Sequence, residues 1–200
     1  MTPNKEDYLK CIYEIGTDMQ KITNKEIAAR MQVSPPAVTE MIKRMKSENL
    51  ILKDKENGYL LTDIGLKLVS ELYRKHRLIE VFLVHHLDYT SDQIHEEAEV
   101  LEHTVSDLFV KRLDKLLGFP QTCPHGGTIP AEGELLVEIN NLPLAAVQEA
   151  GTYLLTRVHD SFELLKYLEK HAIHIGDQLQ VKQFDSFSNS FTLINKDEDL

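Results

Sequence analysis

The sequence contains little cysteine and no long apolar stretch. Cys11 and Cys123 are its only cysteines, too few for a disulfide framework, and they give no sign of an oxidising compartment. No run of roughly 18 apolar residues is present, which argues against a transmembrane helix. The N-terminal MTPNKEDYLK lacks the apolar core of a signal peptide. We therefore expect a soluble, cytoplasmic protein with no membrane partner.

Positive charge is scarce in the second part of the chain. The 200 residues are 42% hydrophobic, which suits two modest domains or one domain with appendages. Residues 1–77 hold 14 Lys and Arg against 11 Asp and Glu, a charge of +3, whereas residues 78–200 hold 8 against 21, a charge of −13. The net charge of −10 argues against nucleic-acid binding only as an average. The basic first part can contact the phosphates of a nucleic acid, and the acidic second part suits cation binding.

The stretch HEEAEVLEH, residues 95–103, concentrates possible metal ligands. Read as a helix, it places four of them on one face: His95, Glu99, Glu102 and His103. A second stripe, roughly 110° round the helix, is apolar: Ala98, Leu101, Val105 and Leu108. For a single glutamate, a solvated acidic face is the simpler interpretation. The bracketing histidines favour a cation site.

Residues 21–51 have the pattern of two helices joined by a short turn. Thr23 with Glu26 forms a capping box, and the first helix follows it. After a break at residues 32–34, Ser34 is the predicted N-cap of a second helix that begins at Pro35 and runs to about Asn49. A helix, a three-residue turn and a helix make a helix-turn-helix.

Two short strands are predicted directly after the second helix. They span residues 50–53 and 58–62, and Asn57-Gly58 is a strong signal for the hairpin turn between them. A helix-turn-helix followed by a hairpin that carries Lys53 and Lys55 is a winged helix. Helical hairpins are also common in proteins that do not bind DNA, so this order favours DNA binding without establishing it.

The rest of the chain divides into a helical part and a β-rich part. One helix is predicted from Asp63 and another from about Asp92 to Gly118; together they carry more apolar surface than an antiparallel pair can cover, so we expect a homodimer. The stretch FPQTCPHGGTIPAEGE is a predicted loop. From about residue 141 we expect a small separate domain with strands at 151–159, 178–184 and 190–194 and a helix at 161–171.

Further ligand candidates lie outside the HEEAEVLEH stretch. His76 and Glu80 are one helical turn apart, a spacing that more often indicates a surface hydrogen bond. Cys123 and His125 form a C-x-H pair in the proline- and glycine-rich loop, which by itself is weak evidence for metal. Asp160, at the start of the last helix, could cap that helix or reach a neighbouring site.

YRKHRLIE followed by IHEEAEVLEH, behind a winged helix, resembles the DtxR/MntR family of metal-dependent transcriptional repressors, particularly its streptococcal manganese and iron regulators of the ScaR, SloR and MtsR type. The resemblance covers essentially the whole chain and implies a mainly α fold with small β elements. It implies a winged helix-turn-helix DNA-binding domain at 1–70, a helical metal-binding and dimerisation domain at 71–125, a linker at 126–140 and a FeoA-like small β-barrel at 141–200. We expect this barrel to contain fewer strands than such a domain usually has, because the sequence ends at NKDEDL after one strand signal.

The resemblance also implies two metal sites. The primary, activating site would consist of Asp7, Glu99, Glu102 and His103. The iron-responsive branch has Met and Cys at the positions of Asp7 and Glu99; two carboxylates shift the preference to Mn(II) or Fe(II) without separating them. A secondary site would consist of Glu80, Cys123, His125 and Asp160, and would also accept Zn(II). The alternative secondary site uses His76 and His95 with Glu80, and we favour the first set.

The implied function is a repressor of metal-uptake genes that binds double-stranded operator DNA as a homodimer and is not an enzyme. By position, one group of residues would lie at base edges (Ser34, Pro36, Thr39 and Glu40) and another near phosphates (Lys43, Arg44 and Lys46). One alternative is a winged-helix regulator that senses an organic ligand. Another is a metal-dependent hydrolase, which is disfavoured because no HExxH pair is present and the winged helix would be unexplained.

Overall fold

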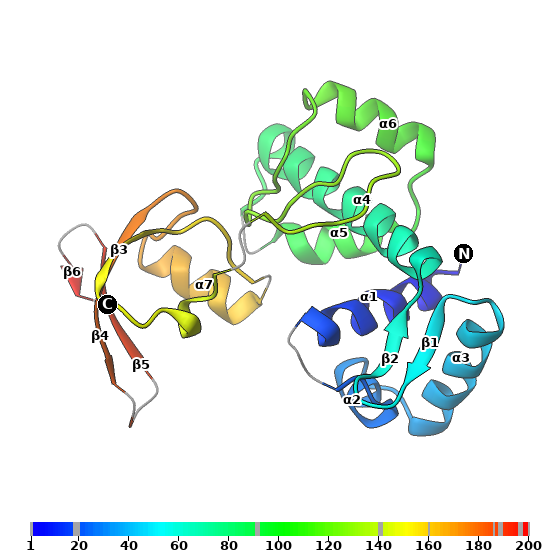
Figure 1. Cartoon of the computed structure of the whole chain (residues 1–200). Coiled ribbons are helices and arrows are strands. Elements are labelled where there is room, and N and C mark those ends of the chain that lie inside the picture. The colour runs from blue at the N-terminus through cyan, green and yellow to red at the C-terminus, as the bar shows by residue number, and fades with distance from the viewer. Residues whose placement is uncertain are drawn as a thin grey trace. The chain divides into compact units, whose positions relative to one another are not determined.

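The computed structural model describes residues 2–17, 21–90, 93–139, 142–159, 161–185, 187, 190–195 and 198–199. Its helices and strands are shown in Figure 1. The chain forms two compact units. The first unit contains residues 1–76, 102–105 and 129–137, and the second contains residues 77–101, 106–128 and 138–200. The fold is mainly helical with two small sheets. Each helix in the described part of the chain is too short or too polar to span a lipid bilayer.

Three helices at the N-terminus confirm the predicted helix-turn-helix. They are α1 (Pro3–Thr17), α2 (Asn24–Arg30) and α3 (Pro35–Ser47). The Thr23 hydroxyl accepts from the backbone N–H of Glu26, and the Ser34 hydroxyl accepts from that of Ala37, as expected of N-caps. α3 ends two residues before the predicted Asn49, which has a positive φ of 56°.

The predicted wing is also present. Strands β1 (Ile51–Asp54) and β2 (Gly58–Leu61) pair antiparallel, with Asp54 opposite Gly58. The Asp54 carboxylate accepts from the backbone N–H groups of Glu56 and Asn57 and so shapes the turn. Gly58 has φ 88°, and a Cβ there would lie 1.9 Å from the carbonyl oxygen of Ile22. Only glycine therefore allows the hairpin to lie against the segment before α2.

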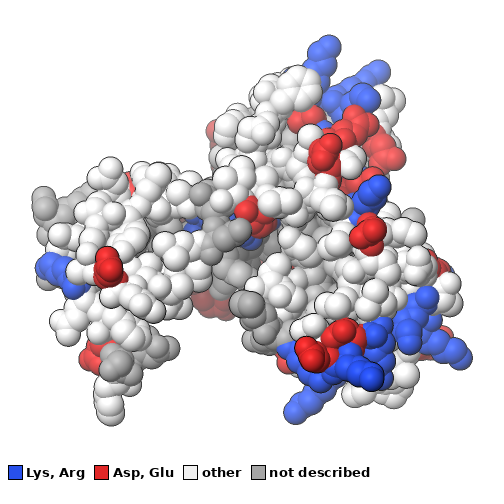
Figure 2. All heavy atoms as spheres, in the orientation of Figure 1, with Lys and Arg blue, Asp and Glu red and all other residues white. Residues whose placement is uncertain are grey.

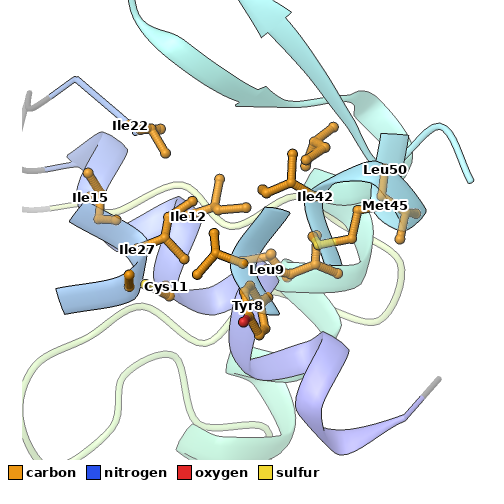
Figure 3. Packing of buried hydrophobic residues seen from close by; sticks show 14 of the residues in the cluster. Tyr8, Leu9, Cys11, Ile12, Ile15, Ile22, Ile27, Ile42, Met45 and Leu50 are labelled. Carbon is orange, nitrogen blue, oxygen red and sulfur yellow. The ribbon is translucent and has the colours of Figure 1, made fainter. Parts of the chain in front are cut away.

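A single apolar core holds the N-terminal helices and the hairpin together. Figure 3 shows side chains of α1 packed against those of α2 and α3. Ile12, Ile27 and Met45, one from each of these helices, are almost completely buried. Burying one such side chain contributes about 1.5–3 kcal/mol. This core fixes α1, which carries Asp7, relative to α3, which carries most of the predicted DNA contacts.

The helical part contains three helices where two were predicted. α4 (Asp63–Leu87) is the expected long helix. The predicted single helix from Asp92 to Gly118 is wrong over its described part: α5 (Ile94–Glu102) and α6 (Asp107–Leu116) are separate helices, and Asp92 lies outside the described residues. The break has a local cause, because the Ser106 hydroxyl accepts from the N–H of Phe109 and caps a new helix. The predicted apolar stripe ends with α5, and Leu108 is 60% exposed.

The C-terminal part contains the predicted mixture of strands and one helix. Strands β3 (Gly151–Leu154), β4 (Gln178–Asp185), β5 (Ser190–Asn195) and β6 (Glu198–Asp199) form one antiparallel sheet in chain order, and α7 (Phe162–Lys170) accompanies them. The strand predicted at 151–159 ends earlier, at Leu154, and the residues after it make hydrogen bonds outside the β3–β4 ladder. The N–H of Leu155 donates to Asp177, and that of Val158 donates to His125.

Candidate metal centres and nucleic-acid interface

The turn after α5 directs His103 toward the first helix. Its ring Nδ1 lies 2.7 Å from Glu6 Oε2, and Nε2 lies 2.9 Å from Asp7 Oδ1. The side chain of His103 is 13% exposed and that of Asp7 is 42% exposed, so the group opens toward solvent. Since His103 follows the last residue of α5, its ring is not confined to the helix face. We call Glu6, Asp7, Glu102 and His103 the first cluster.

Glu102 forms the buried end of the first cluster. Its side chain is fully buried, and Oε2 lies 2.5 Å from Nδ1 of His76. The other oxygen, Oε1, lies 3.6 Å from Lys10 Nζ and 3.6 Å from His103 Nε2. Within the described part of the chain Oε1 has no hydrogen-bond partner, and 3.6 Å is longer than a normal hydrogen bond. A buried carboxylate oxygen in this state is a suitable donor for a cation.

The predicted primary site is brought together in large part. Asp7, Glu102 and His103 belong to the first cluster. Glu99 lies three residues before Glu102 on α5, where its Oε1 is 3.8 Å from Nε2 of His95. Carboxylate oxygens and one imidazole are ligands that hard divalent cations accept, so the residues fit such an ion. The full ligand set stays a prediction.

Glu80, Cys123 and His125 form a second cluster. Each offers one donor atom, and these atoms all lie within 4.8 Å of one another. Oε1 of Glu80 lies 3.3 Å from Nδ1 of His125. All three residues are buried, in contrast to the first cluster. One oxygen, one sulfur and one nitrogen donor fit a zinc ion.

Two close backbone approaches shape the loop that carries Cys123 and His125. The N–H of Gly126 donates to the carbonyl of Cys123. Gly126 has φ 81°, and a Cβ there would lie 1.9 Å from the carbonyl oxygen of Thr156. The N–H of Val158 donates to the carbonyl of His125 at 3.0 Å. Residues 156–158 therefore run directly against the loop, and position 126 has no room for a side chain.

A network of ion pairs holds the far end of this loop. Arg77 donates to the carbonyl of Thr128, and its Nη2 lies 2.7 Å from Glu138 Oε1. Arg157 reaches the same oxygen at 3.3 Å, and the N–H of Thr128 donates to Glu138 Oε2. Burial raises the pKa of Glu138, but Arg77, Arg157 and the hydrogen bonds outweigh burial and keep that pKa below its usual value. Glu138 is therefore a carboxylate at neutral pH.

The other predicted secondary ligands have different surroundings. Asp160 lies outside the described residues. His76 contacts Glu102 at 2.5 Å. The ring of His95 lies 3.9 Å from Glu80 and 3.8 Å from Glu99. The choice between the two predicted versions of the secondary site stays open.

The predicted DNA-contacting residues share an exposed face of the helix-turn-helix. All seven are exposed: Ser34, Pro36, Thr39, Glu40, Lys43, Arg44 and Lys46. Figure 2 shows basic side chains gathered over the region of α2 and α3. Three of the seven have side-chain contacts within the protein: the Ser34 hydroxyl accepts from the N–H of Ala37, the Thr39 hydroxyl accepts from Asn24, and Arg44 pairs with Glu48 at 3.3 Å. Lys43 and Lys46 stand on the same exposed face as phosphate-contact candidates.

Three charged residues in these clusters were not predicted. Glu6 precedes Asp7 and contacts His103, Lys10 lies beside Glu102, and Glu138 holds the loop of the second cluster. Lys10 lies at i+3 of Asp7 on α1, so helical spacing around Asp7 could have suggested it. Glu6 directly precedes Asp7, and no helical spacing rule indicates its role. Nothing in the local sequence around Glu138 indicates its role, because its partners are distant in the chain.

Comparison with known proteins finds one consistent family. The description "Iron dependent repressor, N-terminal DNA binding domain" matches residues 1–59, and "Iron dependent repressor, metal binding and dimerisation domain" matches residues 62–131. The chain is 32% identical over 153 residues to the iron-dependent repressor IdeR of Mycobacterium tuberculosis, covering 76% of this chain and 65% of that protein. It is 31% identical over 155 residues to the diphtheria toxin repressor of Corynebacterium diphtheriae, covering 76% and 69%. The chain thus spans about two thirds of the length of these relatives, which by name are repressors and not enzymes.

Several solved structures have the same fold. The manganese regulator SloR is 60% identical with a TM-score of 0.89, covering 100% of this chain and 93% of its own. The apo form of the manganese-activated repressor ScaR is 63% identical with a TM-score of 0.93, covering 97% and 92%. A manganese-dependent transcriptional repressor in complex with manganese is 33% identical with a TM-score of 0.86, covering 98% and 94%.

Proposed function

Because the chain belongs to the iron-dependent repressor family, we propose that it is a DNA-binding transcriptional repressor whose corepressor is a divalent metal ion. The observation that supports this most directly is that the first cluster and the exposed face of α3 belong to one compact unit. Their physical link is α1, because Lys5, next to Glu6, lies 2.5 Å from Glu48 at the end of α3.

The corepressor we propose for the primary site is Mn(II) or Fe(II). The ion would be held by Asp7, Glu99, Glu102 and His103. These residues supply mainly oxygen donors, which Mn(II) and Fe(II) prefer over softer donors such as sulfur. The bound ion supplies positive charge between carboxylates that otherwise repel. Asp7 and His103 would then be held together by the same ion. Metal and DNA would favour the same conformation and strengthen each other reciprocally, typically by about 1–3 kcal/mol.

For the secondary site we propose Glu80, Cys123 and His125, with Asp160 as the fourth residue. The buried set with one thiolate and one imidazole would also accept Zn(II). His76 and His95 remain the alternative members. The ordered loop around Gly126 supports the first version, because it presents Cys123 and His125 together.

The domain assignment follows the family. We propose a winged helix-turn-helix at 1–70, a metal-binding and dimerisation domain at 71–125, a linker at 126–140 and a FeoA-like small β-barrel at 141–200, the last supported by the antiparallel sheet of β3 to β6. A homodimer is supported by apolar side chains on the surface of the second unit, Leu108, Leu116 and Phe119, each about 60% exposed.

On DNA, the exposed face of α3 would enter the major groove of a two-fold operator. Ser34, Pro36, Thr39 and Glu40 would lie at base edges, and Lys43, Arg44 and Lys46 nearer phosphates. The repressed genes would be those of metal uptake, so that excess metal shuts off its own entry.

The test is a DNA-binding titration on a labelled two-fold symmetric site selected by the protein from random sequence. Mn(II) or Fe(II) should strengthen binding, and a chelator should reverse the effect. Asp7→Ala should remove the metal response while leaving the dimer folded. Asp63→Ala, which removes an exposed acid at the start of α4 in the same unit, is the matched control and should respond like the wild type.

Two results would contradict this proposal. If Asp7→Ala keeps the full metal response, the primary site is assigned wrongly. If the wild type binds DNA equally well with and without metal, the winged-helix regulator of an organic ligand becomes the better description.

A further inference from the structure

A buried lysine lies beside the first cluster. The side chain of Lys10 is only 9% exposed, although lysine is rarely buried without a partner. Its ammonium lies 3.6 Å from Glu102 Oε1 and 5.6 Å from the centre of the Tyr73 ring. The Tyr73 hydroxyl in turn donates to Glu14 at 2.8 Å, so the ring beneath the ammonium is held in place.

The position of Lys10 matters because Glu102 is the fully buried member of the cluster. A buried carboxylate without a counter-charge is costly. At 3.6 Å the ammonium is close enough to stabilise Glu102 electrostatically and too far for a normal hydrogen bond. The ammonium of Lys10 therefore offsets the charge of the Glu102 carboxylate, while a lone pair of Oε1 stays available to a cation.

A charge count points in the same direction. The side chains joined by these contacts bring three carboxyl groups, those of Glu6, Asp7 and Glu102, and one ammonium, that of Lys10. The proposed ligand Glu99 adds a fourth carboxyl group. Removing the ammonium would leave these carboxyl groups without its positive charge, so the cluster would attract a cation more strongly.

We propose that Lys10 is a built-in counter-cation of the primary site and sets the metal concentration at which the site fills. This inference rests on the proposed role of the first cluster as the corepressor site. The ammonium stabilises the metal-free cluster and repels the entering cation, so both effects weaken metal binding. The cluster consequently releases its ion as the free metal concentration falls.

The experiment measures Mn(II) affinity by competition with a fluorescent chelator, using wild type, Lys10→Met and Lys10→Arg. Methionine keeps most of the length of the side chain and removes its charge, so Lys10→Met should bind Mn(II) on the order of tenfold more tightly. Lys10→Arg keeps the charge and should stay close to the wild type. DNA binding by Lys10→Met should respond at a correspondingly lower Mn(II) concentration.

Thermal unfolding supplies an independent readout. Metal-free Lys10→Met should melt a few degrees lower than the wild type because Glu102 loses its counter-charge, and Mn(II) should raise its Tm by more than that of the wild type. Lys10→Gln is a second uncharged variant in case Lys10→Met folds poorly, and its affinity should change in the same direction.

The Asp7→Ala background separates the two hypotheses. There the Lys10→Met substitution should leave Mn(II) affinity unchanged, because the site it acts on has been removed. If Asp7→Ala alone has no effect on Mn(II) affinity, the proposed primary site fails. If Asp7→Ala weakens binding but Lys10→Met binds Mn(II) as the wild type does, or more weakly, the role given to Lys10 is wrong.

Discussion

The two clusters contain similar numbers of ligand candidates but differ in exposure and in donor type. In the first cluster the Asp7 side chain is 42% exposed and that of Glu6 is 25% exposed. In the second, Glu80 is fully buried and His125 is 2% exposed. The first offers carboxylates and an imidazole; the second adds the sulfur of Cys123.

This difference indicates different properties for the two proposed sites. An oxygen-rich group open to solvent suits a hard ion that enters and leaves easily, as a sensor requires. A buried group with a thiolate suits a softer ion that is held longer, and its occupancy depends on the loop around it. The first cluster should therefore follow metal concentration, and the second should behave as a structural site.

A substitution at Gly126 tests whether the second cluster depends on its loop. Gly126→Ala forces a Cβ to within 1.9 Å of the Thr156 carbonyl at φ 81°. It should lower the free energy of unfolding by about 2–5 kcal/mol, from backbone strain plus steric conflict, and abolish zinc binding at the second cluster. Gly133→Ala is the matched control: it has the same φ and nothing within 4 Å, so only the strain of about 1–2 kcal/mol applies. Urea unfolding of both variants measures the contrast, and equal losses would show that the contact with Thr156 is unimportant.

The difference in donor type can be tested at Cys123. Cys123→Ser should weaken zinc binding about a hundredfold, since the thiolate is the soft ligand, and should leave the Mn(II) response of DNA binding intact. Zinc should also protect Cys123 of the wild type from alkylation. Cys11 is the internal control: burial and the nearby Glu14 carboxylate raise its pKa to about 11, so it should react slowly with or without zinc. If Cys123→Ser binds zinc as tightly as the wild type, the sulfur of Cys123 is not a ligand of the site.

The contribution of the ion network can be measured at Glu138. Glu138→Gln leaves Arg77 and Arg157 without their carboxylate and should cost about 2 kcal/mol at pH 7. The folded pKa of Glu138 is below its unfolded value, so its contribution is complete above about pH 4.3 and is lost as the pH falls through the folded pKa. The difference in urea unfolding between wild type and variant should thus shrink on acidification. Glu134→Gln, at an exposed position in the same segment, should have the same free energy of unfolding as the wild type at pH 7 and at acidic pH.

The smallest expected effect concerns Glu6. Because Glu6 contacts Nδ1 of His103 at 2.7 Å, Glu6→Gln should disturb the orientation of the imidazole and weaken Mn(II) binding about tenfold. Zinc binding at the second cluster should not change. Calorimetric titration with each metal checks both statements. A stronger loss than that of Asp7→Ala would instead identify Glu6 as a direct ligand.

Much of the local structure could be predicted from residue types and spacing. The N-caps Thr23 and Ser34, the wing and the long helix α4 follow from rules that act within a few residues, and the structure confirms them. The missed end of α5 has a local cause as well, because Ser106 is an N-cap inside an apparently continuous helical pattern. The ligand types were also visible in HEEAEVLEH and in the C-x-H pair.

The sequence by itself determined the helices, the turn residues and the kinds of donor atom, since these depend on neighbours in the chain. Only the tertiary structure decided which donors meet. Glu6 and His103 are 97 positions apart, and the contact of Lys10 with Glu102 likewise joins separate helices. Such contacts arise from how apolar faces pack and where a helix ends, and no spacing rule along the chain encodes them. For the same reason, Glu138 is recognisable as the partner of Arg77 only in the folded structure, which places the two charges side by side.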